Sequence, residues 1–173
     1  MVRTLMTLQE FCDTLPESKQ VELAVNLIKH ILPVWDNYAK QSSLSYRDTV
    51  VGLTHTVPKQ LLADTINEVE IYFSVPMLLR KLKRKDKLIK LYSHFSDPVI
   101  ALRDTDWELP QAVEKTFYSV YNLTGSIVDK KKTIFDESAI YVSINQAIDA
   151  IQLTGLLSEK QIQEIIYQPK NDS

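Results

Sequence analysis

The sequence predicts an all-α fold, a single-domain helical bundle of about six or seven helices. Apolar residues recur at i, i+3 and i+4 spacing along most of the chain, which is the period of an amphipathic helix. Prolines and capping motifs divide this pattern into segments of ordinary helix length. The chain has 173 residues, 45% of them hydrophobic, so it can bury a core without disulfides or metal. One domain spanning residues 1–173 is expected.

The first strong helix signal lies near residue 16. Thr14 and Glu17 have capping-box spacing, and Pro16 stands in the first turn, where a missing backbone N–H costs nothing. An apolar stripe then runs over residues 21–31, as expected for a core-facing helix. Pro33 is predicted to end or kink this helix.

Residues 46–73 predict two consecutive helices or one kinked helix, with a break at Pro58. Residues 69–75 also alternate strictly between apolar and polar, which is the period of a half-buried strand, and residues 140–144 do the same. A small two-stranded feature formed by these two stretches is therefore the alternative to an entirely helical chain.

A basic segment at residues 78–95 lies between the two halves of the chain and is expected to connect them. Its only acid is Asp86, against seven cations: Arg80, Lys81, Lys83, Arg84, Lys85, Lys87 and Lys90. Apolar turns at residues 78–82 and 88–95 predict a core-facing stripe with a polar notch at residues 83–87. This is either one helix or two short helices that meet at Lys85-Asp86. Residues 96–98, Ser-Asp-Pro, should end it.

The second half predicts three helices. Pro110 opens the first, whose apolar stripe is Val113, Thr116, Phe117, Val120, Leu123 and Ile127. Gly125 lies either where a neighbouring helix crosses closely or near the helix end.

Asp136 is the expected N-cap of the next helix, which should stop at Gly155. Ser158 and Gln161 form a second capping box, which opens a last helix to about Tyr167.

Parts of this pattern resemble a known family. The stretch LPESKQVELAVNLIKHILPVWDNYAKQSSLSYRD, residues 15–48, resembles the opening of an all-helical bacterial family, the domain of unknown function four-one-six. Residues 109–112 and 137–151 resemble its second half, and the basic segment has no counterpart. The resemblance implies an all-helical fold and no catalytic residue. Related helical proteins include some that protect bacteria from toxins, so it also implies a toxin-neutralising immunity protein.

The residues that carry common catalytic and cofactor chemistry are sparse. Three glycines leave no glycine-rich loop for phosphates, and three histidines are isolated in sequence, so no pair has metal-ligand spacing. Cys12 lies beside an apolar face, where a buried inert thiol is expected. Asp104 and Asp106 could bind a divalent cation, but acids before a helix are usually attracted by its dipole. We therefore predict no catalytic residue, no cofactor, no metal site and no enzyme.

Composition and charge favour a cytoplasmic protein. The single cysteine excludes an internal disulfide and fits a reducing compartment. No secretory signal and no apolar run of membrane-spanning length is found. A net charge of -2 argues against a dedicated nucleic-acid binder, so any such role would be local to the basic segment.

The basic segment allows three interpretations: binding of nucleic acid or an anionic membrane surface, docking of an acidic protein partner, or a solvated face without a ligand. Its aromatic residues, Tyr92 and Phe95, are not interleaved with the cations as a base-stacking surface requires. We expect a non-enzymatic protein-interaction module, with a nucleic-acid-associated protein using residues 80–90 as the alternative. The partner-binding candidates are Arg80, Lys81, Lys83, Arg84, Lys85, Lys87, Lys90 and Tyr92. The partner and the oligomeric state stay open.

Overall fold

The computed structural model describes residues 6–41, 45–47, 54–104, 109–129, 133–134 and 137–167. Within these ranges the protein is almost entirely helical, which confirms the predicted all-α bundle. The seven helices are α1 (Leu8–Thr14), α2 (Glu17–Gln41), α3 (Leu61–Ser74), α4 (Leu78–Asp104), α5 (Gln111–Val128), α6 (Ala139–Thr154) and α7 (Glu159–Tyr167). Two short antiparallel ladders pair β1 (Ser45–Arg47) with β2 (Thr54–Thr56) and β3 (Thr133–Ile134) with β4 (Glu137–Ser138).

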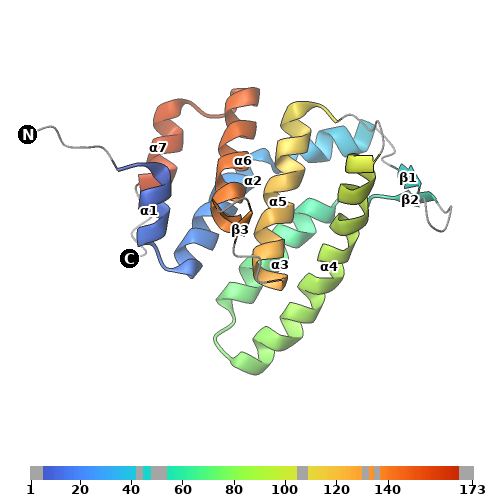
Figure 1. Cartoon of the computed structure of the whole chain (residues 1–173), viewed down its shortest axis with the longest axis horizontal. Coiled ribbons are helices and arrows are strands. Elements are labelled where there is room, and N and C mark those ends of the chain that lie inside the picture. Colours follow the sequence, from blue (N-terminus) through green and yellow to red (C-terminus); the bar gives the residue numbers. More distant parts are fainter. Residues whose placement is uncertain are drawn as a thin grey trace, which may run out of the picture.

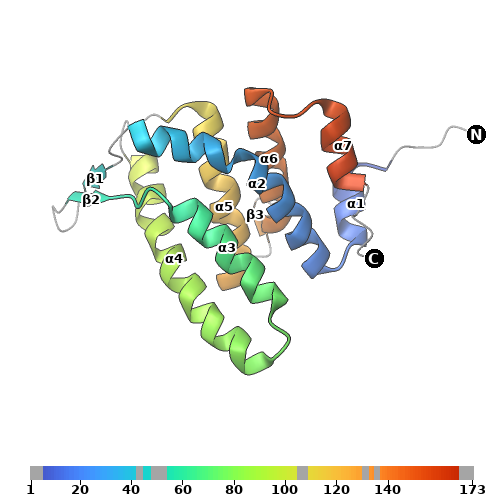
Figure 2. The ribbon, with the colours of Figure 1, turned by 180° about the vertical axis from the view of Figure 1, so that it is seen from behind.

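The long helices form two layers (Figures 1 and 2). Helices α4, α5 and α6 lie in one layer, and α2 and α3 lie behind them. Helix α5 packs against both α6 and α2, and α3 packs along α4. Helices α1 and α7 lie side by side at one end, where the rings of Phe11 and Tyr167 are 4.8 Å apart, and β1 and β2 lie at the other end. None of the described helices combines the length and apolarity needed to cross a membrane.

Three buried aromatic residues join the two layers. The ring of Phe117 on α5 lies 5.5 Å from Trp35 on α2 and 5.2 Å from Phe95 on α4. Each of the three side chains is at most 1% exposed. The indole N–H of Trp35 also donates to the carbonyl of Lys59 at 3.2 Å, so the same cluster holds the entry to α3.

Two buried or partly buried side-chain hydrogen bonds connect helices α5 and α6. The Ser143 hydroxyl donates to the carbonyl of Ser119 at 2.6 Å, and the Asn122 amide donates to Gln146 Oε1 at 2.8 Å. Because these polar groups satisfy one another across the interface, they can be buried with little cost.

Gly125 lies inside α5 and gives room to a neighbouring helix, one of the two positions expected for it. A Cβ atom at residue 125 would lie 3.1 Å from the hydroxyl oxygen of Tyr92, closer than an ordinary van der Waals contact. The predicted stripe of α5 is confirmed as well: all six of its residues are buried.

The start of the chain is capped differently from the prediction. Thr7 caps α1 in a capping box with Glu10, whose carboxylate accepts from the Thr7 backbone N–H at 2.7 Å. That hydrogen bond lowers the pKa of Glu10. Thr14 is the last residue of α1, and its hydroxyl donates to the carbonyl of Phe11, so the capping box predicted at Thr14 and Glu17 is wrong.

The corner between α1 and α2 is closed by Gln20. Its side-chain amide donates to the carbonyls of Cys12 and Leu15, at 2.8 and 3.1 Å. The first helical bonds of α2 are accepted by the carbonyl of Pro16. Helix α2 continues through Pro33 and changes direction along its length (Figure 2), so of the two outcomes predicted there, the helix bends and does not end.

The strand alternative is wrong where it was placed, because residues 69–74 belong to α3 and residues 140–144 to α6. Apolar residues two apart also fit a short stretch of helix, and the packing decides between the two periods. A helix before Pro58 is also wrong: the described residues there form β1 and β2, and Val50 and Leu53 lie outside the described ranges.

The last two helices begin and end largely as predicted. Ser138 caps α6, whereas the expected cap, Asp136, lies outside the described ranges. Gly155 ends α6 with a φ of 66°, the left-handed conformation that glycine adopts without strain. The capping box of Ser158 and Gln161 is confirmed by bonds of 2.8 and 3.2 Å between each backbone N–H and the other side chain.

Substituting Gly125 should reveal its contact with Tyr92. Alanine has the higher helix propensity by about 1 kcal/mol, but it overpacks the Tyr92 hydroxyl at a cost of about 1–3 kcal/mol. We expect Gly125→Ala to lower the free energy of unfolding by about 1 kcal/mol in the wild type and to raise it in a Tyr92→Phe background. Urea denaturation of the four proteins measures both changes. Equal changes in the two backgrounds would contradict the contact.

The thiol of Cys12 should be unreactive toward thiol-specific reagents in the folded protein. Its side chain is 2% exposed, and burial, with a smaller contribution from Asp13, raises the pKa of the thiol to about 11. The reactive thiolate is therefore almost absent at mildly alkaline pH. We expect a thiol-specific reagent to modify native protein far more slowly than urea-unfolded protein at the same pH. Comparable rates would show that the N-terminal corner opens readily.

Candidate interaction surface on helix α4

The basic segment is the first part of one continuous helix. Helix α4 runs without a break from Leu78 to Asp104, so of the two predicted arrangements the single helix is correct. The predicted end at residues 96–98 is wrong, because the helix continues through Pro98. Asp104 consequently stands at a helix C-terminus, where the helix dipole does not favour an acid, and Asp106 lies outside the described ranges.

The inner face of α4 is anchored by three residues from the second apolar turn. Leu88 and Phe95 are fully buried, and Tyr92 is 8% exposed. The Tyr92 ring stacks on that of Tyr121 at 5.4 Å. Burial and then hydrogen bonding with Tyr121 raise the pKa of the Tyr92 phenol. Tyr92 is thus a core residue, and it drops out of the partner-binding candidates.

A buried carboxylate on α3 fixes two of the predicted cations. Glu68 is 1% exposed, and its Oε1 and Oε2 lie 3.1 and 3.3 Å from Nη1 of Arg84. The ammonium of Lys87 lies 2.8 Å from Oε2. Burying an unpaired carboxylate is very costly, so these two cations are structural partners that neutralise it.

Glu68 was missed by the sequence analysis, although a signal was present. Leu61, Thr65 and Glu68 share one side of α3 at i, i+4 and i+7, and all three are buried. A charged residue at a core-facing position, ten residues before a basic segment, indicates an ion pair with that segment.

The outer face of α4 combines exposed apolar and basic residues. Leu78 and Leu79 are 74% and 75% exposed, and Leu82 and Ile89 are 54% and 43% exposed. The prediction that residues 78–82 face the core is therefore wrong. Leu88 faces the core, and Arg84 and Lys87 reach Glu68 along the side of the helix that faces α3. The helical period then turns residues 78, 82 and 89 outward. We call this set the basic–apolar face: Leu78, Leu79, Leu82, Lys83, Ile89 and Lys90.

The cations of the outer face have no carboxylate partner in the part of the chain that the structure describes. Lys83 and Lys90 are exposed, as is Arg80 on another side of the helix. Asp86 is the one acid of the segment and is exposed beside them. Among the described residues, these charges face solvent without an ion-pair partner.

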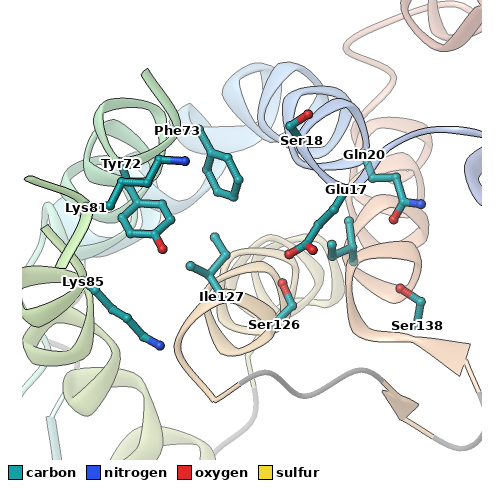
Figure 3. Close-up of a pocket in the computed structure, with 11 residues that line it drawn as sticks. Glu17, Ser18, Gln20, Tyr72, Phe73, Lys81, Lys85, Ser126, Ile127 and Ser138 are labelled. Atoms are coloured by element: carbon teal, nitrogen blue, oxygen red, sulfur yellow. The ribbon is translucent and has the colours of Figure 1, made fainter. Parts of the chain in front are cut away.

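Lys81 and Lys85 occupy a third position, on the wall of a cleft. They are partly buried and, together with side chains of α2, α3, α5 and α6, line a cavity of about 700 Å³ (Figure 3). The Lys81 ammonium also lies 5.9 Å from the centre of the Tyr72 ring. The eight predicted residues therefore divide among the core, an ion pair, a cleft and an exposed face.

Removing the partners of Glu68 should cost more than removing exposed charges. With Arg84→Met and Lys87→Met together, the buried carboxylate loses both cations, and we expect a loss of about 2–3 kcal/mol in the free energy of unfolding. The loss is smaller than for a fully buried ion pair, because the two cations are 40% and 58% exposed and already share the carboxylate with solvent. Adding Glu68→Met should restore most of it. The matched control, Arg80→Met with Lys83→Met, should change stability by about 0.5 kcal/mol or less. Urea denaturation measures all three, and equal losses in the two double variants would contradict the assignment.

Comparison with other proteins adds no relative: no family model, no curated protein and no solved structure matches the chain. In the described ranges, no group of three or more His, Cys, Asp or Glu side chains is arranged to hold a metal ion. The basic–apolar face, defined by its exposure and charge, is the feature from which a function can be argued.

Proposed function

We propose that this protein is a non-enzymatic protein-interaction module that binds an acidic partner through the basic–apolar face of α4. One observation supports the proposal above the others: four large aliphatic side chains are exposed on one helix, next to lysines without a partner among the described residues. Contiguous exposed apolar surface is uncommon on a monomer and marks interaction sites. The lysines add attraction for acidic groups and speed the encounter.

The alternative, a nucleic-acid-associated protein using residues 80–90, has less support. Arg84 and Lys87 are held by Glu68, and Tyr92 is buried, so the exposed face offers no aromatic ring for stacking on bases. The phosphates of a nucleic acid would also make no favourable contact with the exposed side chains of Leu79 and Leu82. An acidic amphipathic helix satisfies both the aliphatic and the basic residues, because it can pair its apolar side with the leucines and its acids with the lysines.

The cellular setting of the proposal comes from the sequence. A cytoplasmic location is favoured by the single cysteine, and a bacterial source and a toxin-neutralising role are implied by the resemblance of residues 15–48 to an all-helical bacterial family. An immunity protein works by covering its toxin with a complementary surface. A toxin bound here would present acidic and apolar groups to α4.

A photo-crosslinking amino acid at residue 79 tests where a partner binds. We expect a protein adduct in extracts of the producing cells when the crosslinker replaces Leu79, and none when it replaces Leu153, which is 49% exposed on α6. The pairs Leu78→Ser with Leu82→Ser and Lys83→Glu with Lys90→Glu should each weaken the identified complex by about tenfold or more. Lys160→Glu, on the exposed surface of α7, is the charge control.

Binding of oligonucleotides would contradict the proposal. If short single- or double-stranded DNA or RNA binds at physiological salt, and if Lys83→Glu with Lys90→Glu abolishes that binding, the nucleic-acid interpretation is correct. These two lysines suit the test because neither pairs with Glu68, so their replacement leaves the buried ion pair intact. An adduct that forms equally from positions 79 and 153 would likewise reject the basic–apolar face.

A further inference from the structure

The cleft beside α4 has the composition of a binding site that the proposed function does not use. Five helices contribute to its wall, and its cavity of about 700 Å³ falls within the size range of small-molecule sites. Figure 3 shows Tyr72, Phe73, Lys81 and Lys85 on one side and Glu17 across from them. The two lysines and the carboxylate of Glu17 thus lie on opposite sides of one cavity that also contains apolar side chains.

The cationic side of the cleft can hold one carboxylate. Lys81 and Lys85 are one helical turn apart on α4, so their side chains lie on the same face of the helix. Neither has a carboxylate within ion-pair distance among the described residues. A carboxylate has two oxygens and can accept from both ammonium groups at once. The cations are partly buried, so such hydrogen bonds are less screened than those of fully exposed lysines.

The rest of the cleft suits an apolar body with few polar contacts. Phe73 and the buried Ile127 and Ile140 supply apolar surface. The Ser138 hydroxyl oxygen accepts from the Tyr141 N–H, which leaves its proton free to donate to a ligand. The Ser126 hydroxyl donates to the carbonyl of Leu123, which leaves its oxygen as an acceptor.

The charge of the wall selects a singly charged ligand. Among the described lining residues, two lysines face one carboxylate, Glu17, so the described part of the wall carries one net positive charge. A monocarboxylate neutralises that charge, whereas a doubly charged phosphate would leave an excess of negative charge near Glu17. We propose that this cleft binds a small amphipathic carboxylate, with its carboxylate between Lys81 and Lys85 and its apolar body against Phe73, Ile127 and Ile140. The inference is independent of the partner proposed for the outer face of α4.

Octanoate is a suitable probe. Titration of the whole protein, labelled at its isoleucine methyl groups and followed by NMR, should show saturable shifts at Ile127 and Ile140, with a dissociation constant of about 1 mM or below. Hexanoate should bind about tenfold more weakly, because each methylene removed from water contributes a factor of about three to four. The uncharged octanamide should bind about tenfold more weakly than octanoate.

Variants locate the carboxylate. Lys81→Gln with Lys85→Gln should weaken octanoate binding by about tenfold or more, whereas the matched pair Lys83→Gln with Lys90→Gln, on the outer face of the same helix, should change it by about twofold or less. Glu17→Gln should strengthen binding by about twofold, because it removes a repulsive charge. The thermal midpoint of each variant confirms that it is folded.

Three results would overturn the inference. The first is no saturable shift up to the solubility limit of octanoate. The second is binding that shifts Ile89 on the outer face while Ile127 and Ile140 stay unchanged, which would place the probe on the exposed leucines. The third is equal weakening by the two lysine pairs, which would indicate attraction to the general basic charge of α4.

Discussion

The burial of one carboxylate determines how α4 is turned about its own axis. Glu68 is almost completely removed from water, and a buried charge must find partners of opposite sign. Arg84 and Lys87 are those partners, and they reach the carboxylate from the side of α4 while Leu88 and Phe95 enter the core. The orientation that satisfies Glu68 leaves Leu78, Leu79, Leu82 and Ile89 in water.

The first half of α4 packs against other helices with one face and exposes the opposite face to solvent. The carboxylate and the aromatic cluster around Phe117 together hold α4 against α3 and α5. The outer side chains are then not needed to hold α4 in place. Exposed apolar residues among them reduce solubility unless a binding partner covers them. Lysines between the leucines offset that cost by keeping the exposed surface charged. A surface of this kind fits the interaction role that we propose for α4.

The fold class and the helices of the second half could be predicted because their signals are local. The stripe of α5, the stop at Gly155 and the capping box at Ser158 all depend on residues a few positions apart. The two ladders could not be found, since pairs of two or three residues leave no periodicity to detect. The continuation of α4 through Pro98 could not be predicted from the sequence either. It depends on packing of the preceding turns, which outweighs the loss of one backbone hydrogen bond.

The candidate sites depend on tertiary contacts, and these limited the prediction. The sequence singled out the cations of the basic segment but treated them as one surface. The structure separates them because Glu68 lies on another helix and because the cleft wall is assembled from five helices. A charged residue at a core-facing position of α3 was the one local sign of the ion pair with Glu68. No comparable local pattern pointed to the cleft.

The contact between Phe11 and Tyr167 has a consequence for how the chain folds during synthesis. These rings come from α1 and α7, and they meet only after the chain up to Tyr167 has left the ribosome. Until then the ring of Phe11 lacks the partner that it has in the finished protein. Contacts between residues so distant in sequence also slow the search for the native state. We therefore expect closure of α1 on α7 to be a late step of folding, completed after the helices between them have packed.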